Sequence, residues 1–367
     1  MGAAACHQLA ARKARILGLE QFDIPNSRGS SHGYSRMIRM AYYEHPNYVP
    51  LLRRAYTLWD ELQARCGRAI LYRTGGLYAG PPDGQFLAGS TRAAVEHELP
   101  HELLDRAELQ KRWPQFVVPE DWRALFEPAA GFLLPERAIS TFAELALRDG
   151  AELHAMERVW QWSAESGRVV VRTDRDEYEA AQLIFAGGAW SEKLIGDLGV
   201  PLRVTRQVMG WVWPREPSSF ELGRIPVWGI DSLDGGIYYG FPMIPDVPGF
   251  KLAHHVPGPG VDAETFDRQT TAADENDFRP ALRKHLPQAD GPLLAMRACM
   301  YTLSPDQHFI LDRHPRHPIV QIACGFSGHG FKFSSVVGEI LADRALRGST
   351  TQPIDFLGLN RFRLQAT

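Results

Sequence analysis

A lone cysteine and a glycine-rich turn lie close together near the C-terminal end of the chain. Cys299 begins the run Cys-Met-Tyr-Thr, and residues 325–333 read Gly-Phe-Ser-Gly-His-Gly-Phe-Lys-Phe just before a helical pattern. The start of a helix attracts negative charge through its free N–H groups and aligned peptide dipoles. A thiol that can form a tether, a helix start that can stabilise an anion and Lys332, which can hold an acid, together indicate a redox site. The cofactor of such a site would gain negative charge when it is reduced.

The first twenty residues are typical of the second half of a Rossmann dinucleotide-binding unit. Residues 1–10 are rich in small side chains and predict a helix, and residues 15–19 predict a short strand that ends at Glu20. In the complete unit, a strand and the motif G-x-G-x-x-G lead into the helix, and an acid about 20 positions further on binds the ribose. Gly2 is therefore expected to be the third glycine and Glu20 the ribose ligand. The alternative is a surface helix followed by an edge strand.

The first strand and the first two glycines of such a unit would have to precede Met1. We therefore expect either a start codon placed roughly a dozen residues late or a true truncation of the motif. An upstream reading frame without a strand followed by Gly-x-Gly-x would exclude the first option.

The remaining pattern indicates a second nucleotide-binding turn and a block of strands. Residues 183–186 predict a buried strand that runs into Gly187 and Gly188, which would allow a cofactor to approach the backbone closely. A last helix is predicted over 334–346, with Gly348 as its cap. Further helices are expected at 48–66 and 141–148, and strands at 70–72, 76–78, 169–171, 178–180, 204–213, 227–230, 237–241 and 251–255.

Composition excludes several classes of protein. A net charge of −3 over 367 residues gives no argument for nucleic acid or an anionic membrane as a partner, and no apolar run reaches the ~18 residues of a membrane span. The four cysteines are far apart, which argues against a disulfide framework or a zinc site and favours a reducing compartment, so we expect a cytoplasmic protein. Residues 312–317, Asp-Arg-His-Pro-Arg-His, are expected to form an exposed loop without a metal.

Several segments, in the same order along the chain, resemble the monomeric sarcosine oxidase and N-methyl-tryptophan oxidase family. This family belongs to the larger group of amine- and D-amino-acid-oxidase-like flavoproteins, and the resemblance covers essentially the whole chain. The segments are residues 29–39, 238–242, 251–255, 299–302 with Pro305 and Asp306, and 325–333.

The resemblance implies an α/β (α+β) fold with two domains. A Rossmann-like FAD-binding domain without its first strand would comprise residues 1–47, 137–200 and 298–367. A mainly antiparallel β substrate domain would comprise residues 48–136 and 201–297.

The resemblance also implies FAD that is held covalently by Cys299, through a bond from sulfur to the flavin 8α-methyl carbon. A positive local field would help to form the thiolate for this bond. The alternative is an ordinary buried cysteine that behaves as a small hydrophobic residue. The other residues implied in cofactor binding are Gly2, Glu20, Ser30, His32, Arg36, Gly187, Gly188, Gly328, Gly330 and Lys332.

A small amino acid with an N-methyl group is the substrate that the resemblance implies. Arg39 and Lys332 match the pair that binds its carboxylate, by a guanidinium fork and a point charge. Lys251 matches a lysine that activates oxygen. The resemblance further implies that Tyr301, His329 and Gly328 bind substrate, and that Tyr239, His255 and Arg36 act with Lys251 in catalysis.

The expected reaction is sarcosine + O2 + H2O to glycine + formaldehyde + H2O2, by a monomer that needs no metal. N-methyl-L-tryptophan and pipecolate-type amino acids are alternative substrates. A third alternative is an inactive or FAD-poor truncated paralogue.

Overall fold

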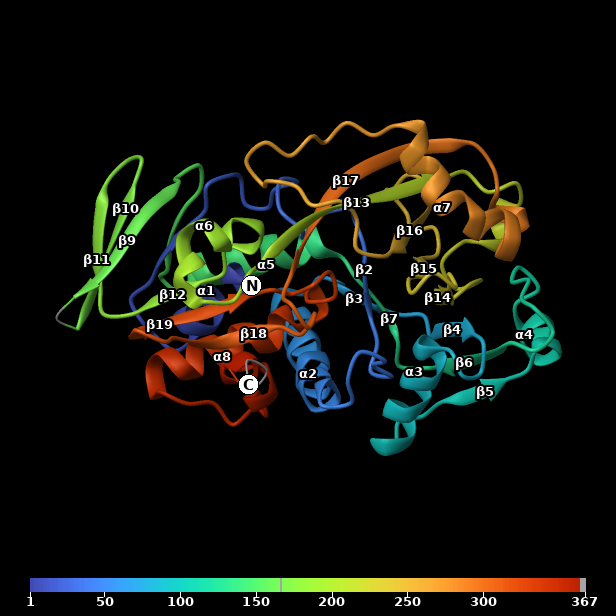
Figure 1. Cartoon of the computed structure of the whole chain (residues 1–367), viewed down its shortest axis with the longest axis horizontal. Coiled ribbons are helices and arrows are strands. Elements are labelled where there is room, and N and C mark those ends of the chain that lie inside the picture. Colours follow the sequence, from blue (N-terminus) through green and yellow to red (C-terminus); the bar gives the residue numbers. More distant parts are fainter. Residues whose placement is uncertain (166, 364–367) are drawn as a thin grey trace.

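Helix α1 (Gly2–Ala11) and strand β1 (Leu17–Leu19) form where the N-terminal pattern predicts them (Figure 1). The computed structural model describes residues 1–165 and 167–363. Strand β1 runs parallel to β8 (Glu152–His154), and a Cβ on Gly18 would lie 3.0 Å from the sulfur of Cys6 in α1. A Cβ on Gly338 would lie only 2.6 Å from the backbone of Ala4. Small residues thus let α1 lie close to both the strand and helix α8 (Ser334–Arg347).

A three-stranded sheet leads into helix α8. Strand β12 (Leu183–Phe185) pairs in parallel with β19 (His317–Cys324), which pairs antiparallel with β18 (Ile310–His314). The chain then passes through the glycine-rich turn into α8, which ends at Gly348 in the left-handed conformation (φ 77°), as predicted. Strand β12 likewise runs into the turn that begins at Gly187.

The expected exposed loop over 312–317 is wrong. These residues form the tight connection of the β18–β19 hairpin, and His314 is buried, with its Nε2 3.1 Å from Asp197 Oδ1. The loop was predicted because two prolines interrupt this segment. Pro315 lies in the turn and Pro318 near the start of β19, where a missing N–H is tolerated.

The largest sheet has eight strands in the order β17-β13-β16-β15-β14-β4-β6-β5. Its pairs are antiparallel except for the parallel pair of β14 and β4, so the prediction of a mainly antiparallel β block is confirmed. The strands are β4 (Gly76–Gly80), β5 (Glu102–Leu104), β6 (Arg123–Glu127), β13 (Arg203–Val212), β14 (Val227–Asp231), β15 (Ile237–Gly240), β16 (Phe250–His255) and β17 (Leu293–Leu303).

Helix α7 (Ala272–His285) packs against this sheet and was not predicted. Its sequence is polar and carries Pro280 inside the helix. These two features make the apolar face formed by Phe278 and Leu282 hard to recognise in the sequence. The helix begins with a capping box in which Thr271 and Asp274 each bind the other's backbone N–H.

Helix α2 (Tyr48–Cys66) has the predicted bounds and packs on α8 in the main core, with Ser335 Oγ donating to Ala55 O. The other elements are β2 (Arg36–Ile38), β3 (Leu71–Arg73), β7 (Gly131–Leu133), β9 (Val159–Glu165), β10 (Arg168–Thr173), β11 (Glu177–Ala180), α3 (Gln85–Glu96), α4 (Arg106–Arg112), α5 (Pro135–Arg148), α6 (Ser191–Ile195) and α9 (Asn360–Arg363).

The division into two domains stays a prediction. Figure 1 shows β13 and β17 running side by side from the side of the molecule that holds α6 and β12 toward the side that holds β14–β16. Strand β17 crosses position 298, where the predicted boundary falls. In residues 1–165 and 167–363, we find no helix with the length and apolar character of a membrane span.

Candidate active site

A cavity of about 850 Å³ brings together residues from the whole length of the sequence. Its walls are α1, strands β1 and β12, the turn before α8, and residues of β13, β15, β16 and β17. The predicted site residues that line it are Gly2, Glu20, Ser30, Arg36, Arg39, Gly187, Gly188, Tyr239, His255, Cys299, Tyr301, Gly328, His329, Gly330 and Lys332. The other two, His32 and Lys251, are buried but are not among the lining residues.

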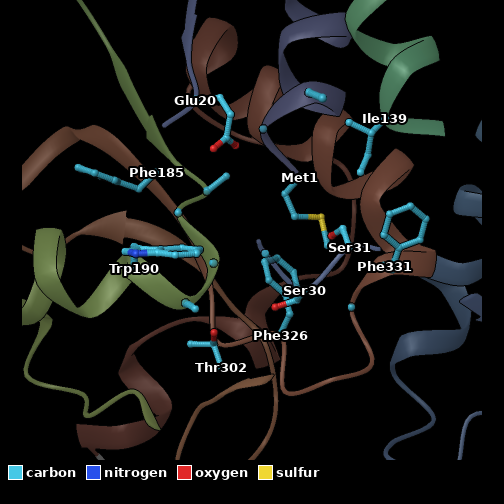
Figure 2. Close-up of a pocket in the computed structure, with 18 of the residues that line it drawn as sticks. Met1, Glu20, Ser30, Ser31, Ile139, Phe185, Trp190, Thr302, Phe326 and Phe331 are labelled. Atoms are coloured by element: carbon cyan, nitrogen blue, oxygen red, sulfur yellow. The ribbon is translucent and has the colours of Figure 1, made fainter. Parts of the chain in front are cut away.

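One end of the cavity has features that suit a nucleotide. In Figure 2 the Glu20 carboxylate and the Met1 side chain point into the same space, with Trp190 on another wall. Glu20 Oε1 accepts a hydrogen bond from the Phe22 N–H (3.0 Å), and burial raises the pKa of this acid. Gly188 has φ 54° and no atom within 4 Å of an ideal Cβ, so the backbone here is open to a close ligand.

Cys299 lies in the middle of strand β17 and is almost fully buried. Its sulfur is 3.8 Å from Ser30 O, on the loop before β2. Burial raises the pKa of this thiol, and the nearby Arg36, Lys251 and Arg268 act in the opposite direction. The positive field expected around Cys299 is therefore present, although burial outweighs it.

The loop before β2 carries a buried histidine beside an arginine. Arg36 donates to Ser30 O (2.8 Å) and Ser35 O (2.9 Å), which holds the loop against the cavity. Both ring nitrogens of His32 are buried without a hydrogen-bond partner in the described part of the chain. Burial, reinforced by Arg36 and Lys251, lowers the pKa of His32 to about 3, so the imidazole is neutral.

Lys251 lies in β16 and reaches the same loop. Its Nζ donates to Gly33 O (2.8 Å), Ser35 O (2.7 Å) and Ser35 Oγ (3.2 Å), and these three acceptors favour the ammonium form. Burial, with Arg36 nearby, lowers the pKa of Lys251. Negative charge that develops close to this amine would therefore favour its protonated form.

Arg39 lies in the part of the cavity that we call the carboxylate end, together with Glu44, His329 and Lys332. Its guanidinium already has a carboxylate partner. It is buried just after β2 and donates to both oxygens of Glu44 (2.8 and 2.7 Å). Its guanidinium lies over the rings of Tyr42 (4.4 Å) and Tyr43 (4.9 Å). Burial alone would raise the pKa of Glu44, but Arg39, His329 and Lys332 lower it to about 2.

Lys332 adds the second cation of this end. It is only 6% exposed, and its Nζ donates to His329 O (2.8 Å) and, at 3.5 Å, to Tyr42 Oη. Burial and the neighbouring Arg39 lower the pKa of Lys332 to about 7. The buried amine therefore titrates near neutral pH, and an anion bound beside it would raise its pKa again.

Neutral polar side chains complete this end. His255 Nδ1 lies 3.0 Å from Tyr301 Oη, and Tyr239 packs edge-on to His255. Burial lowers the pKa of His255 to about 4 and that of His329 to about 3. Gly328 packs against Tyr301, since a Cβ there would come within 2.5 Å of the ring.

Three residues of the site were missed by the sequence analysis. Glu44 pairs with Arg39, Tyr42 bridges Lys332 and His329, and Phe86 of α3 lines the cavity beside Gly229. The signal for Glu44 was its position five residues after Arg39, although the sequence does not show whether the two side chains meet. A Cβ on Gly229 would lie 2.6 Å from the Phe86 ring, so this wall is tightly packed.

The residues present fit FAD. The cavity is within the usual 300–1,000 Å³ range of cofactor pockets. The first turn of α1 presents N–H groups without a side-chain cap, which suits a pyrophosphate, and Glu20 suits a ribose. Two lining residues, Trp190 and Thr302, bury polar atoms that have no partner in residues 1–165 and 167–363.

Comparison with known proteins gives one consistent result. The family of FAD dependent oxidoreductases matches residues 1–344. Monomeric sarcosine oxidase of Streptomyces avermitilis is 44% identical over 358 residues, which cover 96% of this chain and 93% of that protein. N-methyl-L-tryptophan oxidase of Salmonella dublin is 35% identical, over 99% of this chain and 96% of that protein. Glycine oxidase from Geobacillus kaustophilus has a similar fold, with a TM-score of 0.80 at 21% identity over 98% of this chain and 95% of that one.

Proposed function

The chain belongs to the family of FAD-dependent oxidoreductases, and on that premise we propose that it is an oxidase of small N-methyl amino acids, with sarcosine as the preferred substrate. The observation that carries this proposal is the pair of buried cations, Arg39 and Lys332, at one end of a cavity whose other end suits a nucleotide. Two buried cations at the end of a cofactor cavity are suited to a substrate carboxylate.

FAD would be held at its ribose, at its pyrophosphate and at its ring system. Gly2, at the start of α1, would face the pyrophosphate, and Glu20 would bind the ribose. The loop with Ser30 and His32, and the turn with Gly328 and Gly330, would contact the ring system. Cys299 would form the covalent tether, supported by its position in the cavity wall and the cations around it. When bound, FAD supplies the electron acceptor for C–H oxidation and then reduces O2.

The carboxylate would engage Lys332 and Arg39. Because Glu44 holds Arg39 with two hydrogen bonds, the substrate carboxylate has to share this guanidinium or displace Glu44 from it. Lys332 becomes protonated as the carboxylate arrives, because an adjacent anion raises its pKa. Positioning by these two cations would account for most of what the protein contributes.

The amine end would face neutral groups. The nitrogen must be unprotonated for oxidation, and neutral His255 beside Tyr301 and Tyr239 avoids stabilising an extra positive charge there. Lys251 would stabilise the negative charge that forms as O2 is reduced, and Arg36 would hold the loop that carries its acceptors. We propose release of H2O2, action as a monomer and, from the four free thiols, a cytoplasmic location.

A small substrate is favoured by the walls of the carboxylate end. Tyr43, Phe86 and Ile237 line the cavity there, and Phe86 packs edge-on against Tyr43 at 5.1 Å. We propose that these side chains leave too little room for an indole, which would favour sarcosine over N-methyl-L-tryptophan.

Two measurements test this function. Purified protein is denatured in acid, and the polypeptide is examined for a flavin band that stays with it; free FAD would contradict the tether. A panel of sarcosine, N-methyl-L-tryptophan and L-pipecolate is then assayed for peroxide. The highest kcat/KM is expected for sarcosine, and a preference for either larger amino acid would refute the assignment of substrate.

A further inference from the structure

A chain of hydrogen bonds leads from Lys332 to the surface of the protein. Lys332 Nζ is 3.5 Å from Tyr42 Oη, which lies 2.6 Å from His329 Nδ1. On the other side of the ring, His329 Nε2 is 3.0 Å from the carbonyl oxygen of Gln307. Tyr42 is completely buried, whereas Gln307 is exposed on a turn with φ 60°. The amine that faces the cavity is thereby connected to the surface through two side chains.

The direction of these hydrogen bonds follows from their chemistry. The Gln307 carbonyl can only accept, so His329 must carry its proton on Nε2 and accept on Nδ1. Tyr42 therefore donates its O–H to Nδ1, which leaves its oxygen lone pairs free to accept from Lys332. Every donor in the chain points outward, from the cavity toward the surface, which is the arrangement that can pass a proton outward.

The charges around the chain support transient protonation of His329. Glu44 Oε1 lies 4.0 Å from His329 Nδ1 and stays ionised at neutral pH, so it stabilises an imidazolium. Burial keeps the resting imidazole neutral by lowering its pKa. The titratable and charged groups that face Lys332 and His329 are Arg39, Tyr42 and Glu44 after β2, Tyr48 of α2 and His255 of β16.

We propose that Lys332, Tyr42 and His329 form the exit path for the proton of the substrate ammonium. The proposal rests on the proposed function, because amino acids arrive at neutral pH as ammonium ions and only the free amine is oxidised. Protonated Lys332 passes a proton to Tyr42 as Tyr42 passes its own to His329 Nδ1. His329 then releases its Nε2 proton to solvent at the Gln307 turn, and neutral Lys332 takes the proton of the ammonium. These transfers move one proton from substrate to solvent and leave Lys332 charged beside the carboxylate. They also leave His329 protonated on Nδ1 instead of Nε2, so exchange of this proton with solvent restores the Nε2–H form before the next turnover.

Tyr42→Phe tests the path because it keeps the ring and removes the oxygen. Flavin reduction is followed anaerobically by stopped flow at saturating sarcosine. At pH 7 the rate should fall about tenfold or more in Tyr42→Phe, and at pH 10, where free amine enters directly, it should be within about twofold of the unmodified protein. Tyr48→Phe is the matched control, since this buried tyrosine packs 5.0 Å from Tyr42 and bonds His308 instead. It should match the unmodified protein at both pH values.

An equal loss in Tyr42→Phe at both pH values, or no loss at either, would overturn the path. If no amino acid of the panel reduces the flavin of the unmodified protein, the proposed function fails, and a second measurement still decides the path. In ¹⁵N-histidine-labelled protein, with His329 assigned through His329→Asn, the neutral ring should carry its proton on Nε2. Its Nδ1 signal should shift in Tyr42→Phe. A proton on Nδ1 in the unmodified protein would reverse the chain and refute the proposal.

Discussion

The affinity of the site for a simple carboxylate should depend on pH through Lys332. Propionate has no amine to oxidise and stays ionised between pH 6 and 9, so its binding reports on the carboxylate end alone. Arg39 and Glu44 keep their charges in this range, and His255 and His329 stay neutral. Lys332, with a pKa of about 7, changes from charged to neutral within it.

The direction and the size of the change in propionate affinity follow from the linkage between propionate binding and protonation of Lys332. The form that binds propionate well is the protonated amine, which predominates below pH 7 and is lost as the pH rises. At pH 7 about half of the amine is protonated, and at pH 9 about one hundredth is, so affinity should fall roughly 50-fold between pH 7 and pH 9. This corresponds to about 2.3 kcal/mol of binding free energy. Isothermal titration calorimetry on the FAD-loaded protein measures the dissociation constant at each pH.

Two variants of the same position sharpen this test. Lys332→Arg keeps its charge at pH 9 and should bind propionate with little dependence on pH, whereas Lys332→Met should bind weakly throughout. An unmodified protein with the same affinity at pH 6 and pH 9 would refute the reasoning. So would a Lys332→Met variant that keeps the full pH dependence.

Three further predictions concern other residues of the site. Glu44→Gln should lower the free energy of unfolding at pH 7 by about 3 kcal/mol, because the pKa of Glu44 falls from 4.5 to about 2 on folding. In the unmodified protein, denaturant titration should show this stabilisation above about pH 4.5 and its loss as the pH falls toward 2. Equal free energies of unfolding of the two proteins at pH 7 would contradict the prediction. Lys251→Met should slow flavin reoxidation by O2 far more than flavin reduction, and equal slowing in stopped flow would exclude the oxygen role. Cys299→Ser should leave the fold intact by circular dichroism but release all FAD on acid denaturation; flavin that still remains on the polypeptide would place the tether elsewhere.

The local sequence pattern was sufficient to predict those elements whose structure is decided by residues close together in the chain. The apolar face of α2 and the cap at Gly348 depend on spacing along the chain, and both were predicted with the bounds that the structure shows. The family resemblance placed Arg39, Lys332 and Cys299 in one site, and the structure brings them to one cavity.

What the sequence did not show depends on distant partners. Tyr42 and His329 are 287 positions apart, and nothing near Tyr42 indicates that its hydroxyl meets this imidazole. Helix α7 was missed because its buried face is short and its packing against the large sheet, rather than its own periodicity, stabilises it. The buried hairpin around His314 was missed for a related reason, since strand pairing outweighed the two prolines.

We propose that this chain oxidises the N-methyl group of sarcosine, and the fate of that methyl carbon tests the proposal. The most direct measurement supplies sarcosine labelled with ¹³C in the methyl group and follows the products by NMR, with peroxide measured in parallel. The label is expected in formaldehyde, with unlabelled glycine and H2O2 formed in equal amounts. Label recovered in methylamine, which would mean that the other C–N bond is broken, or the absence of any product from flavin-loaded protein, would contradict the account.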